Sequence, residues 1–318
     1  MSRLDRKKAK KKGKWKKIGI FVTVALLCLV LSTVGYGYYQ YKKGMELAAK
    51  NKNSIIVDSP KKIEFKSVDI PNKTNVLLLG VDAHKNGERS RTDSIMILQY
   101  TKNHETKLIS LMRDSYVSIP GHGNQKLNAA YSFGGVELLR QTIQENFGIG
   151  LEYYSIIDFR SFEKMIDVIA PQGITVDVEK SMSSHIGVTL QPGVQQLHGK
   201  ELLGYARFRH DARGDFDRVA RQQKVLNAIK NEVLTVKGIT TSVPKTLGLI
   251  QPYIQTNFSS FDLVKLGTDF MLRGKNNEIK TLRIPQDNTY VPKRYDNVGE
   301  VLELDIEKNR EILQSFLN

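Results

Sequence analysis

Nineteen residues in the second half of the chain, YARFRHDARGDFDRVARQQ (205–223), contain five arginines and three aspartates. Charge of this density occurs either on a solvated surface, where the aspartates neutralise the arginines, or around a bound anion. The planar arginine guanidinium donates two parallel hydrogen bonds to phosphate oxygens, which favours a phosphate or pyrophosphate over a single carboxylate. The residue types therefore leave two alternatives, a charged surface and an anion pocket.

The spacing of these residues predicts two basic groups that face each other. In an extended segment, Arg207 and Arg209 point to one side and Phe208 points to the other, into the core. The second group belongs to the first turns of a helix, where positions i, i+3 and i+4 share a face, and consists of Arg218, Arg221 and Gln222. Cations at a helix N-terminus oppose the macrodipole and destabilise the helix by roughly 0.3–1 kcal/mol each. An anion bound between the two basic groups would offset this cost.

Two more basic positions lie at the ends of expected elements. Arg113 follows the strand KLISL (107–111), at the edge where open α/β sheets bind ligands, although a structural ion pair is an equal alternative. Lys126 begins a helix, where backbone N–H groups and a basic side chain together favour phosphate. A lysine in a first helical turn is commonplace, so this position alone is a weak signal.

Carboxylates form a further group. Asp82 ends the apolar run VLLLGVD (76–82), and Asp93 follows eleven residues later, so one loop can fold both around a cation. Two carboxylates with substrate phosphates are the usual arrangement for Mg²⁺, which keeps waters and takes few protein ligands. The alternative is that Asp82 caps a turn while Asp93 pairs with Arg91.

The same stretch contains residues to which we assign no chemistry. His210 and Asp211 have the types of a general base and its orienting carboxylate, but the sequence supplies no nucleophile beside them. We therefore interpret His210 as a structural or rim histidine. Arg213 is assigned to the loop and to solvent.

Strands alternating with helices must position these residues. Strands are expected at 76–82, 94–100, 107–111, 153–159, 173–178 and 278–285. Helices are expected at about 127–147 with a stop at Gly148, and at 162–170, 218–236, 243–256 and 260–272. This order predicts an α/β fold, in which a single domain over residues 74–318 has a mixed central sheet flanked by helices.

The N-terminus predicts a membrane anchor. Ten of the first seventeen residues are Lys or Arg, and the uncharged, then aromatic-rich, residues 18–39 are long enough to cross a bilayer as a helix. The basic cluster places the N-terminus in the cytoplasm. We therefore expect a cytoplasmic tail (1–17), a transmembrane helix (18–39), a stalk (40–73) and an extracellular domain, a single-pass type II topology in the cell membrane. A cleaved secretory signal is the alternative, with a poor cleavage site at residues 35–37.

Composition narrows the class of partner. The net charge of +15 is due mainly to the tail, because the other 38 basic and 32 acidic residues leave about +6. The tail is too short and unpatterned to read bases, so we expect no nucleic-acid partner. Cys28, the only cysteine, lies within the expected span, so the exported domain is predicted to depend on its core rather than on disulfides.

Four segments in a fixed order carry a resemblance to a known family. They are NVLLLGVD (75–82), SRTDSIMIL (90–98), MRDSYVSIPGHGNQKLNAAYSFGG (112–135) and LHGKELLGYARFRHDARGDFDRVARQQ (197–223). Together they resemble the LytR-CpsA-Psr family of Gram-positive envelope enzymes over about residues 74–230. Arg-Thr-Asp-Ser stands where that family usually has Arg-Ser-Asp-Thr, and Leu-Met-Arg-Asp where Ile-Pro-Arg-Asp is common. Both departures spare the charged positions.

The resemblance implies a phosphotransferase that moves a phosphorylated glycopolymer, such as wall teichoic acid or capsule, from a polyprenyl-pyrophosphate carrier to a peptidoglycan sugar hydroxyl. It implies Mg²⁺ at Asp82 and Asp93, and an apolar cleft for the prenyl chain. Its pyrophosphate-contacting positions correspond here to Arg91, Arg113, Arg207, Arg209, Arg218 and Gln222. Arg221 and Lys126 match family motifs with less defined roles.

From this we predict Arg113, Asp93 and Asp82 as the catalytic residues, with either aspartate as the candidate base. A magnesium-bound carboxylate is a poor base, so that last assignment stays open. Two alternatives use the same pocket differently. One is a pyrophosphatase that acts on the lipid with water as acceptor, and the other is an adaptor that binds the lipid-linked polymer without turnover.

Overall fold

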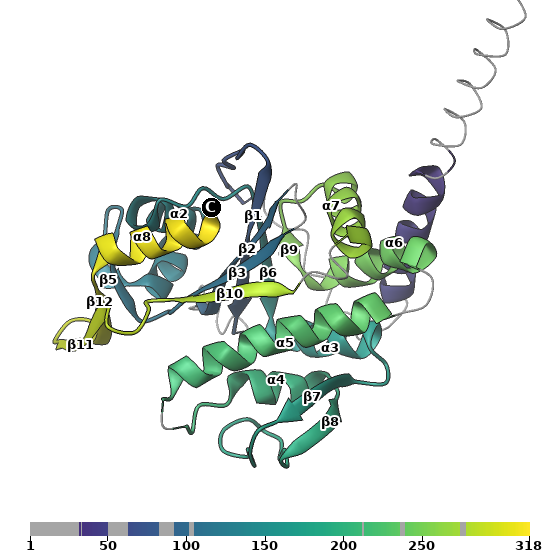
Figure 1. The fold of residues 1–318 in the computed structure, drawn as a ribbon. Helices are drawn as coiled ribbons and strands as arrows, with labels where there is room; N and C mark the ends of the chain where they lie inside the picture. The colour runs from purple at the N-terminus through teal and green to yellow at the C-terminus, as the bar shows by residue number, and fades with distance from the viewer. Residues whose placement is uncertain are drawn as a thin grey trace, which may run out of the picture.

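The computed structural model describes residues 32, 34–49, 63–82, 92–101, 105–211, 213–235, 239–273 and 278–318. A six-stranded sheet runs through the centre of this part of the chain (Figure 1). Its strands in spatial order are β10 (Ile279–Ile284), β3 (Thr106–Leu111), β2 (Thr92–Thr101), β1 (Lys73–Val81), β6 (Tyr153–Asp158) and β9 (Gln255–Thr256). Because β1 pairs antiparallel with β2 and parallel with β6, the sheet is mixed, which confirms the prediction.

Two smaller sheets and a set of helices surround this sheet. One small sheet has the order β11 (Tyr290–Tyr295), β12 (Gly299–Leu304), β4 (Ser115–Ile119) and β5 (Gly123–Lys126), and the other pairs β7 (Ile174–Val178) with β8 (Gly193–Leu197). The helices are α2 (Leu127–Phe147), α3 (Phe159–Ile169), α4 (Gly199–Arg207), α5 (Asp215–Thr235), α6 (Ile239–Ile250), α7 (Ser260–Arg273) and α8 (Ile306–Leu317), with a 3₁₀ turn at Gln251–Tyr253.

Helices cover both faces of the large sheet. Successive side chains of a strand point to opposite faces, so Leu77 of β1 joins the core that contains Leu139 of α2, whereas Leu78 packs in a second cluster with Leu226 of α5. Figure 1 shows α2 and α5 on opposite sides of the strands. Burial on both faces explains why β1 is a continuous apolar run rather than an alternating one.

Most predicted elements are present near their expected bounds. The predicted strand 107–111 is β3 and the predicted helix 127–147 is α2, which Gly148 ends in the left-handed conformation with a φ of 70°. The predicted helix at 243–256 is correct only in part, because α6 ends at Ile250 and β9 occupies residues 255–256.

The extended segment predicted around Arg207 is wrong in its first half. Arg207 is the last residue of α4, in which Leu202 and Tyr205 are fully buried at helical spacing. The chain becomes extended at Phe208, which has a φ of −59° and a ψ of 136°. Phe208 is buried, as predicted.

The predicted transmembrane helix falls mostly outside the described residues. Of residues 18–39, only 32 and 34–39 are described, and they belong to a helical stretch that continues to residue 49. In the part of the chain that the structure describes, no helix combines the length and the apolar character that a membrane span needs.

Of residues 40–73, predicted as a stalk, the structure describes 40–49 and 63–73, and both parts contact the domain. The helix over residues 34–49 packs against α6, with Tyr41 and Ala48 buried, and its Gly44 meets the backbone of Lys245. Further on, the Phe65 ring lies 5.0 Å from that of Tyr154. The composition of this region is polar, but a few small and aromatic residues suffice to dock its described parts on the domain.

The close approach of the helix over residues 34–49 to α6 predicts that Gly44→Ala destabilises the protein. The new Cβ would meet the carbonyl oxygen of Lys245, a backbone atom that cannot move aside. We expect the free energy of unfolding to fall by about 1–3 kcal/mol, although alanine favours a helix over glycine by about 1 kcal/mol. Thermal unfolding of the full chain in detergent measures the change.

Gly35→Ala, in the same helix, is the matched control because no atom lies within 4 Å of its added Cβ. It should leave the melting temperature unchanged or raise it slightly. If the two variants melted alike, the helix would not be docked on α6.

Candidate functional site

A cavity of about 450 Å³ lies at the edge of the large sheet where β3 and β6 end. Residues distant in sequence converge on it from β2, from the chain after β3, from the end of α4 and from the first turns of α5. The predicted site residues that line it are Asp93, Arg113, Arg207, Arg209, Arg218 and Gln222. The carboxyl ends of parallel strands are where α/β sheets bind ligands, which agrees with the reasoning that selected Arg113.

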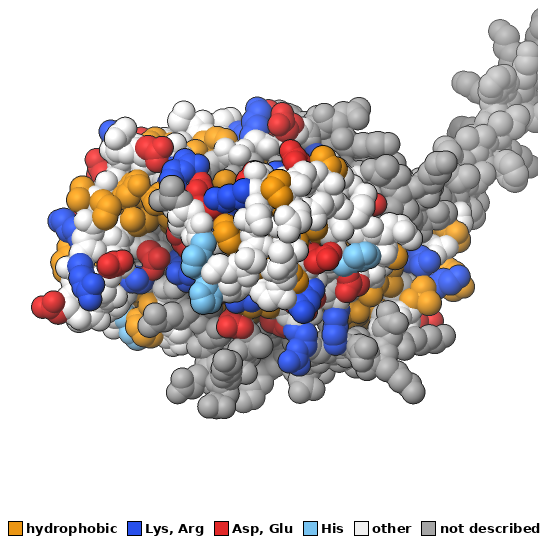
Figure 2. All heavy atoms as spheres, turned by 90° about the horizontal axis from the view of Figure 1, so that it is seen from below, with side chains coloured by type: hydrophobic (Ala, Val, Ile, Leu, Met, Phe, Trp, Pro, Cys, Tyr) orange, Lys and Arg blue, Asp and Glu red, His pale blue; other side chains and the backbone are white. Residues whose placement is uncertain are grey.

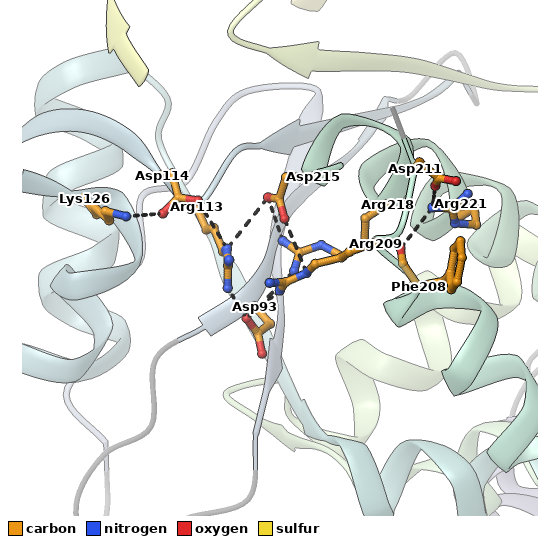
Figure 3. Close-up of polar contacts among 10 residues, drawn as sticks. All are labelled: Asp93, Arg113, Asp114, Lys126, Phe208, Arg209, Asp211, Asp215, Arg218 and Arg221. Carbon is orange, nitrogen blue, oxygen red and sulfur yellow. Dashed lines mark hydrogen bonds and ion pairs between the residues drawn. The ribbon is translucent and has the colours of Figure 1, made fainter. Parts of the chain in front are cut away.

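Asp93 lies at the centre of the arginine group (Figure 3). Its Oδ1 accepts a hydrogen bond from Arg113 Nη1 at 2.6 Å and one from Arg209 Nη2 at 3.4 Å. The same oxygen lies 4.0 Å from Arg218 Nη1. Three guanidinium groups from three separate segments therefore meet at one carboxylate oxygen.

Asp215, the first residue of α5, is the second carboxylate of the group. Its Oδ2 accepts a hydrogen bond from Arg218 Nη2 at 2.8 Å, and its oxygens lie 3.5 Å from Arg209 Nε and 3.7 Å from Arg113 Nε. Burial raises the pKa of the Asp215 carboxyl, and the charges of Arg113 and Arg209 oppose that rise. The aspartates and arginines thus neutralise each other in part and also form a pocket. The two alternatives drawn from the sequence, mutual neutralisation and an anion pocket, therefore both apply.

Arg207 adds a positive charge at the rim of the cavity. Its guanidinium lies over the ring of Phe159, 4.3 Å from the centroid. Among the described residues no carboxylate lies within 4 Å of it, so its charge remains available to an anion. With Arg113, Arg209 and Arg218, four guanidinium groups line the cavity, and only one carboxylate, that of Asp93, lines it with them, so the cavity has an excess of positive charge.

Lys126 does not belong to the residues that line the cavity. It immediately precedes α2, and its Nζ lies 2.9 Å from Asp114 Oδ1. The other oxygen of Asp114 lies 3.5 Å from Arg113 Nε. Lys126 therefore contacts the arginine group only through Asp114.

The structure does not bring Arg221 into the cavity. Arg221 is 4% exposed, and it donates hydrogen bonds to the carbonyl of Phe208 at 2.9 Å and to Glu179 Oε1 at 2.8 Å while pairing with Asp211. Figure 3 shows this group apart from Asp93. A residue advances about 100° around a helix, so positions i+3 and i+4 lie on opposite sides of position i, and here Gln222 turns toward the cavity while Arg221 turns away.

Glu179, whose side chain is 42% exposed, is a surface partner of the buried Arg221. Burial acts to raise the pKa of the Glu179 carboxyl, but hydrogen bonds from Arg221 and Tyr205 bring it below its ordinary value. The carboxylate is therefore held ionised beside the guanidinium, which is the behaviour of a structural ion pair.

The predicted metal ligands lie at neighbouring strand ends. Asp82 directly follows β1, and Val81 pairs with Thr92, beside Asp93, at a register shift between β1 and β2. All the arginine contacts of Asp93 use Oδ1, which leaves Oδ2 for another ligand. Among the described residues no cluster of three or more His, Cys, Asp or Glu side chains is arranged to hold a metal. Two carboxylates completed by phosphates and waters fit Mg²⁺ rather than a metal held by protein alone.

Asp82 itself is exposed and does not line the cavity. Arg91 lies outside the described residues. The roles predicted for Asp82 and Arg91 therefore stay predictions.

Four residues of the cavity were not selected from the sequence. They are Ser94, Phe159, Ser184 and His185. Ser184 and His185 belong to a polar stretch without hydrophobic periodicity, which offers no signal for its place in the fold. His210, interpreted above as a structural or rim histidine, lies at the rim and is exposed.

The contacts of Arg221 predict a structural effect of its substitution. Arg221→Ala removes a partner of Asp211, whose side chain is 1% exposed, and breaking a buried pair costs about 3–5 kcal/mol. We expect the lower part of this range, because Lys180 also pairs with Asp211. Denaturant unfolding measures the loss, and Arg213→Ala, at a side chain 73% exposed, is the control. Equal stability of the two variants would show that Arg221 does not hold this loop.

Comparisons with known proteins agree with this geometry. A model of the LytR_cpsA_psr family matches residues 38–315. "Regulatory protein MsrR" of Staphylococcus aureus (strain COL) is 41% identical over 287 residues, which cover 90% of this chain and 85% of the relative. "Polyisoprenyl-teichoic acid--peptidoglycan teichoic acid transferase TagU" of Bacillus licheniformis is 32% identical over 260 residues, 80% of this chain and 83% of the relative.

A solved structure extends the likeness to the fold. "LytR-CPS2A-psr family protein YwtF (TagT) with bound octaprenyl pyrophosphate lipid" superposes with a TM-score of 0.58 at 25% identity, over 80% of this chain and 95% of that one. The family model spans most of the sequence, the four motifs occur in the expected order, and charged residues of three of them meet in one cavity. The chain therefore belongs to the LytR-CpsA-Psr family.

Proposed function

We propose that this protein is a magnesium-dependent phosphotransferase that attaches an anionic glycopolymer, of the wall teichoic acid or capsule type, to a peptidoglycan sugar hydroxyl. The donor is the polymer linked to a polyprenyl-pyrophosphate carrier. The observation that carries the proposal is the convergence of Arg113, Arg209 and Arg218 on Asp93 in one cavity. The transferase name of the Bacillus relative and the octaprenyl pyrophosphate bound to YwtF (TagT) support this donor and this reaction class.

The arginine group stabilises charge that moves during transfer. The acceptor oxygen forms a bond to the phosphorus that bears the polymer, the bond from that phosphorus to the bridging oxygen breaks, and polyprenyl phosphate leaves with the electron pair. Such transition states need positioning and charge stabilisation more than covalent chemistry. Arg218 is 2% exposed, and a donor in this position is already oriented and little screened by water.

Asp82 and Asp93 are the residues that would hold Mg²⁺, which when bound would neutralise negative charge on the pyrophosphate oxygens. Arg113 and Arg209 already contact Asp93. They would keep its carboxylate oriented for metal binding. Lys126 acts indirectly, because its contact with Asp114 holds that carboxylate beside Arg113.

The same proposal includes the place of action. Residues 18–39 would anchor the protein in the cell membrane, with the tail 1–17 in the cytoplasm and the catalytic domain outside the cell. The donor lipid lies in that membrane, so anchoring keeps enzyme and donor together. On the face shown in Figure 2, Lys and Arg side chains lie among Asp and Glu without a continuous basic region, which gives no support to a nucleic-acid partner.

Replacement of Arg113 tests the function. Purified full-length protein is incubated with lipid-linked polymer, peptidoglycan acceptor and Mg²⁺, and the covalent polymer-peptidoglycan product is measured. Arg113→Ala is expected to lower the transfer rate by about 100–1,000-fold, because an oriented donor to the transition-state charge is lost. Chelation of Mg²⁺ should abolish transfer, and its return should restore it.

Arg294→Ala is the matched control, since Arg294 is an exposed residue of β11 outside the cavity. Released polymer phosphate without linkage to peptidoglycan would instead identify a pyrophosphatase. Binding without turnover would identify an adaptor.

The site also predicts how the protein binds inorganic pyrophosphate. Arg209 is the arginine of the group to replace for this purpose, because its side chain is 39% exposed and its loss spares the core. A hydrogen bond to a charged group contributes about 1.5–3 kcal/mol, so Arg209→Ala should weaken binding by about 10–100-fold. Isothermal titration calorimetry in the presence of Mg²⁺ measures the affinity. Arg213→Ala should bind like wild type, and an equal loss in both variants would contradict the assignment.

A further inference from the structure

Two histidines and a serine form a polar group at the rim of the arginine cavity. His210 Nε2 lies 3.3 Å from Ser184 Oγ, and the rings of His210 and His185 stack with centroids 5.2 Å apart. All three residues line the same cavity as Arg113 and Arg218. They come from the loop before α5 and from the segment between β7 and β8, so the fold brings two distant segments together here.

Transfer to a hydroxyl needs a group that accepts its proton. Among the described residues that line the cavity, only Asp93, His185 and His210 have side chains of the types that act as general bases. Asp93 accepts a hydrogen bond from Arg113 at 2.6 Å and is a proposed magnesium ligand, so its electron pairs are committed to cations. The two histidines are left for this role.

The position of His210 matches the path of a large acceptor. His210 and His185 are exposed, whereas Arg218 is buried. A pyrophosphate held by the arginines would lie deeper, and a sugar hydroxyl of a polymer would approach from solvent, on the side of the histidines.

The contacts that orient the His210 ring also differ from those of His185. Asp211, its neighbour in sequence, does not orient it, because that carboxylate pairs with Arg221 and Lys180. The contact with Ser184 and the stack on His185 fix the ring instead. The ring of Phe208 lies 6.2 Å away on the core side.

We propose that His210 is the general base of the transfer reaction and that Ser184 and His185 are its positioning residues, an inference that rests on the proposed function. In the tautomer in which Nε2 donates to Ser184 Oγ, Nδ1 is unprotonated and takes the proton of the acceptor hydroxyl. The acceptor oxygen bonds to phosphorus, the bond to the bridging oxygen breaks, and the electron pair leaves on polyprenyl phosphate. The imidazolium then returns its proton to solvent.

His210→Gln in the full chain tests this assignment with the transfer assay described above. We expect kcat to fall by about 100-fold, the lower end for a general base, because a loose phosphoryl-transfer transition state needs proton removal only late. Affinity for inorganic pyrophosphate should stay within about twofold, because the arginines remain. Added imidazole should restore part of the rate.

The pH profile gives a readout that a structural role would not move. A general base must be unprotonated to act, so wild-type kcat/KM should fall from neutral toward acidic pH, and the His210→Gln profile should lack this fall. The ionisable groups that line the cavity around His210 are His185 with Asp93, Arg113, Arg207, Arg209 and Arg218. Arginines do not titrate in this range.

Three comparisons decide the outcome. His122→Gln, at an exposed histidine between β4 and β5, should keep both rate and profile. Ser184→Ala should lose about tenfold in kcat and keep the acidic fall, as expected when one hydrogen bond that positions the base is lost. If His210→Gln kept the wild-type rate and pH profile, the assignment to His210 would be overturned. The same would hold if only His185→Gln removed the acidic fall. The proposed transfer function would survive either result, and it would fail only if the wild-type protein made no product.

Discussion

Two carboxylates, Asp93 and Asp215, hold three arginine side chains close together, and the shape of the cavity depends on that pairing. Three guanidinium groups this near would repel one another without a counter-charge. Partly buried ion pairs add little net stability, because desolvation offsets much of the attraction. Their value here is geometric: the carboxylates orient N–H groups that phosphate oxygens can share or take over, so the donors need little reorganisation when a pyrophosphate enters.

That geometry requires both the sheet and α5. Arg113 leaves β3 at a fixed sheet edge, and Arg218 lies in the first turns of a helix whose leading residue is Asp215. An acidic side chain at a helix N-terminus is favoured by the macrodipole, and a cation there is disfavoured. Asp215 therefore compensates Arg218 before substrate binds, and a pyrophosphate would add to the same favourable field.

The sequence was sufficient for the site residues that lie at the ends of well-patterned elements. Arg113 after a buried strand and Arg218 in a periodic helix were placed correctly, because hydrophobic periodicity fixes such elements. The sequence was insufficient where tertiary contacts decide which secondary structure a segment forms. Arg207 was assigned to an extended segment because two arginines two apart suggest a strand, but burial of Leu202 and Tyr205 continues α4 through it.

Weak patterns explain the remaining differences. The strands β4 and β5 are short and separated by a three-residue turn that contains Gly121, so periodicity gives no signal for them. Ser184 and His185 lie in a stretch without regular structure, and only the completed fold brings them to His210. The expected stalk was inferred from polar composition, which does not reveal that Gly44 allows a helix to approach α6 closely.

The loop before α5 shows how a residue can matter to the site without touching it. Phe208 and Asp211 point inward, and the side chains between them, Arg209 and His210, line the cavity. Arg221 binds both inward positions, the carbonyl of Phe208 and the carboxylate of Asp211. By fixing the two ends of this four-residue segment, Arg221 fixes the direction of the two side chains between them. An arginine that resembled a phosphate ligand in sequence therefore supports the site without lining the cavity.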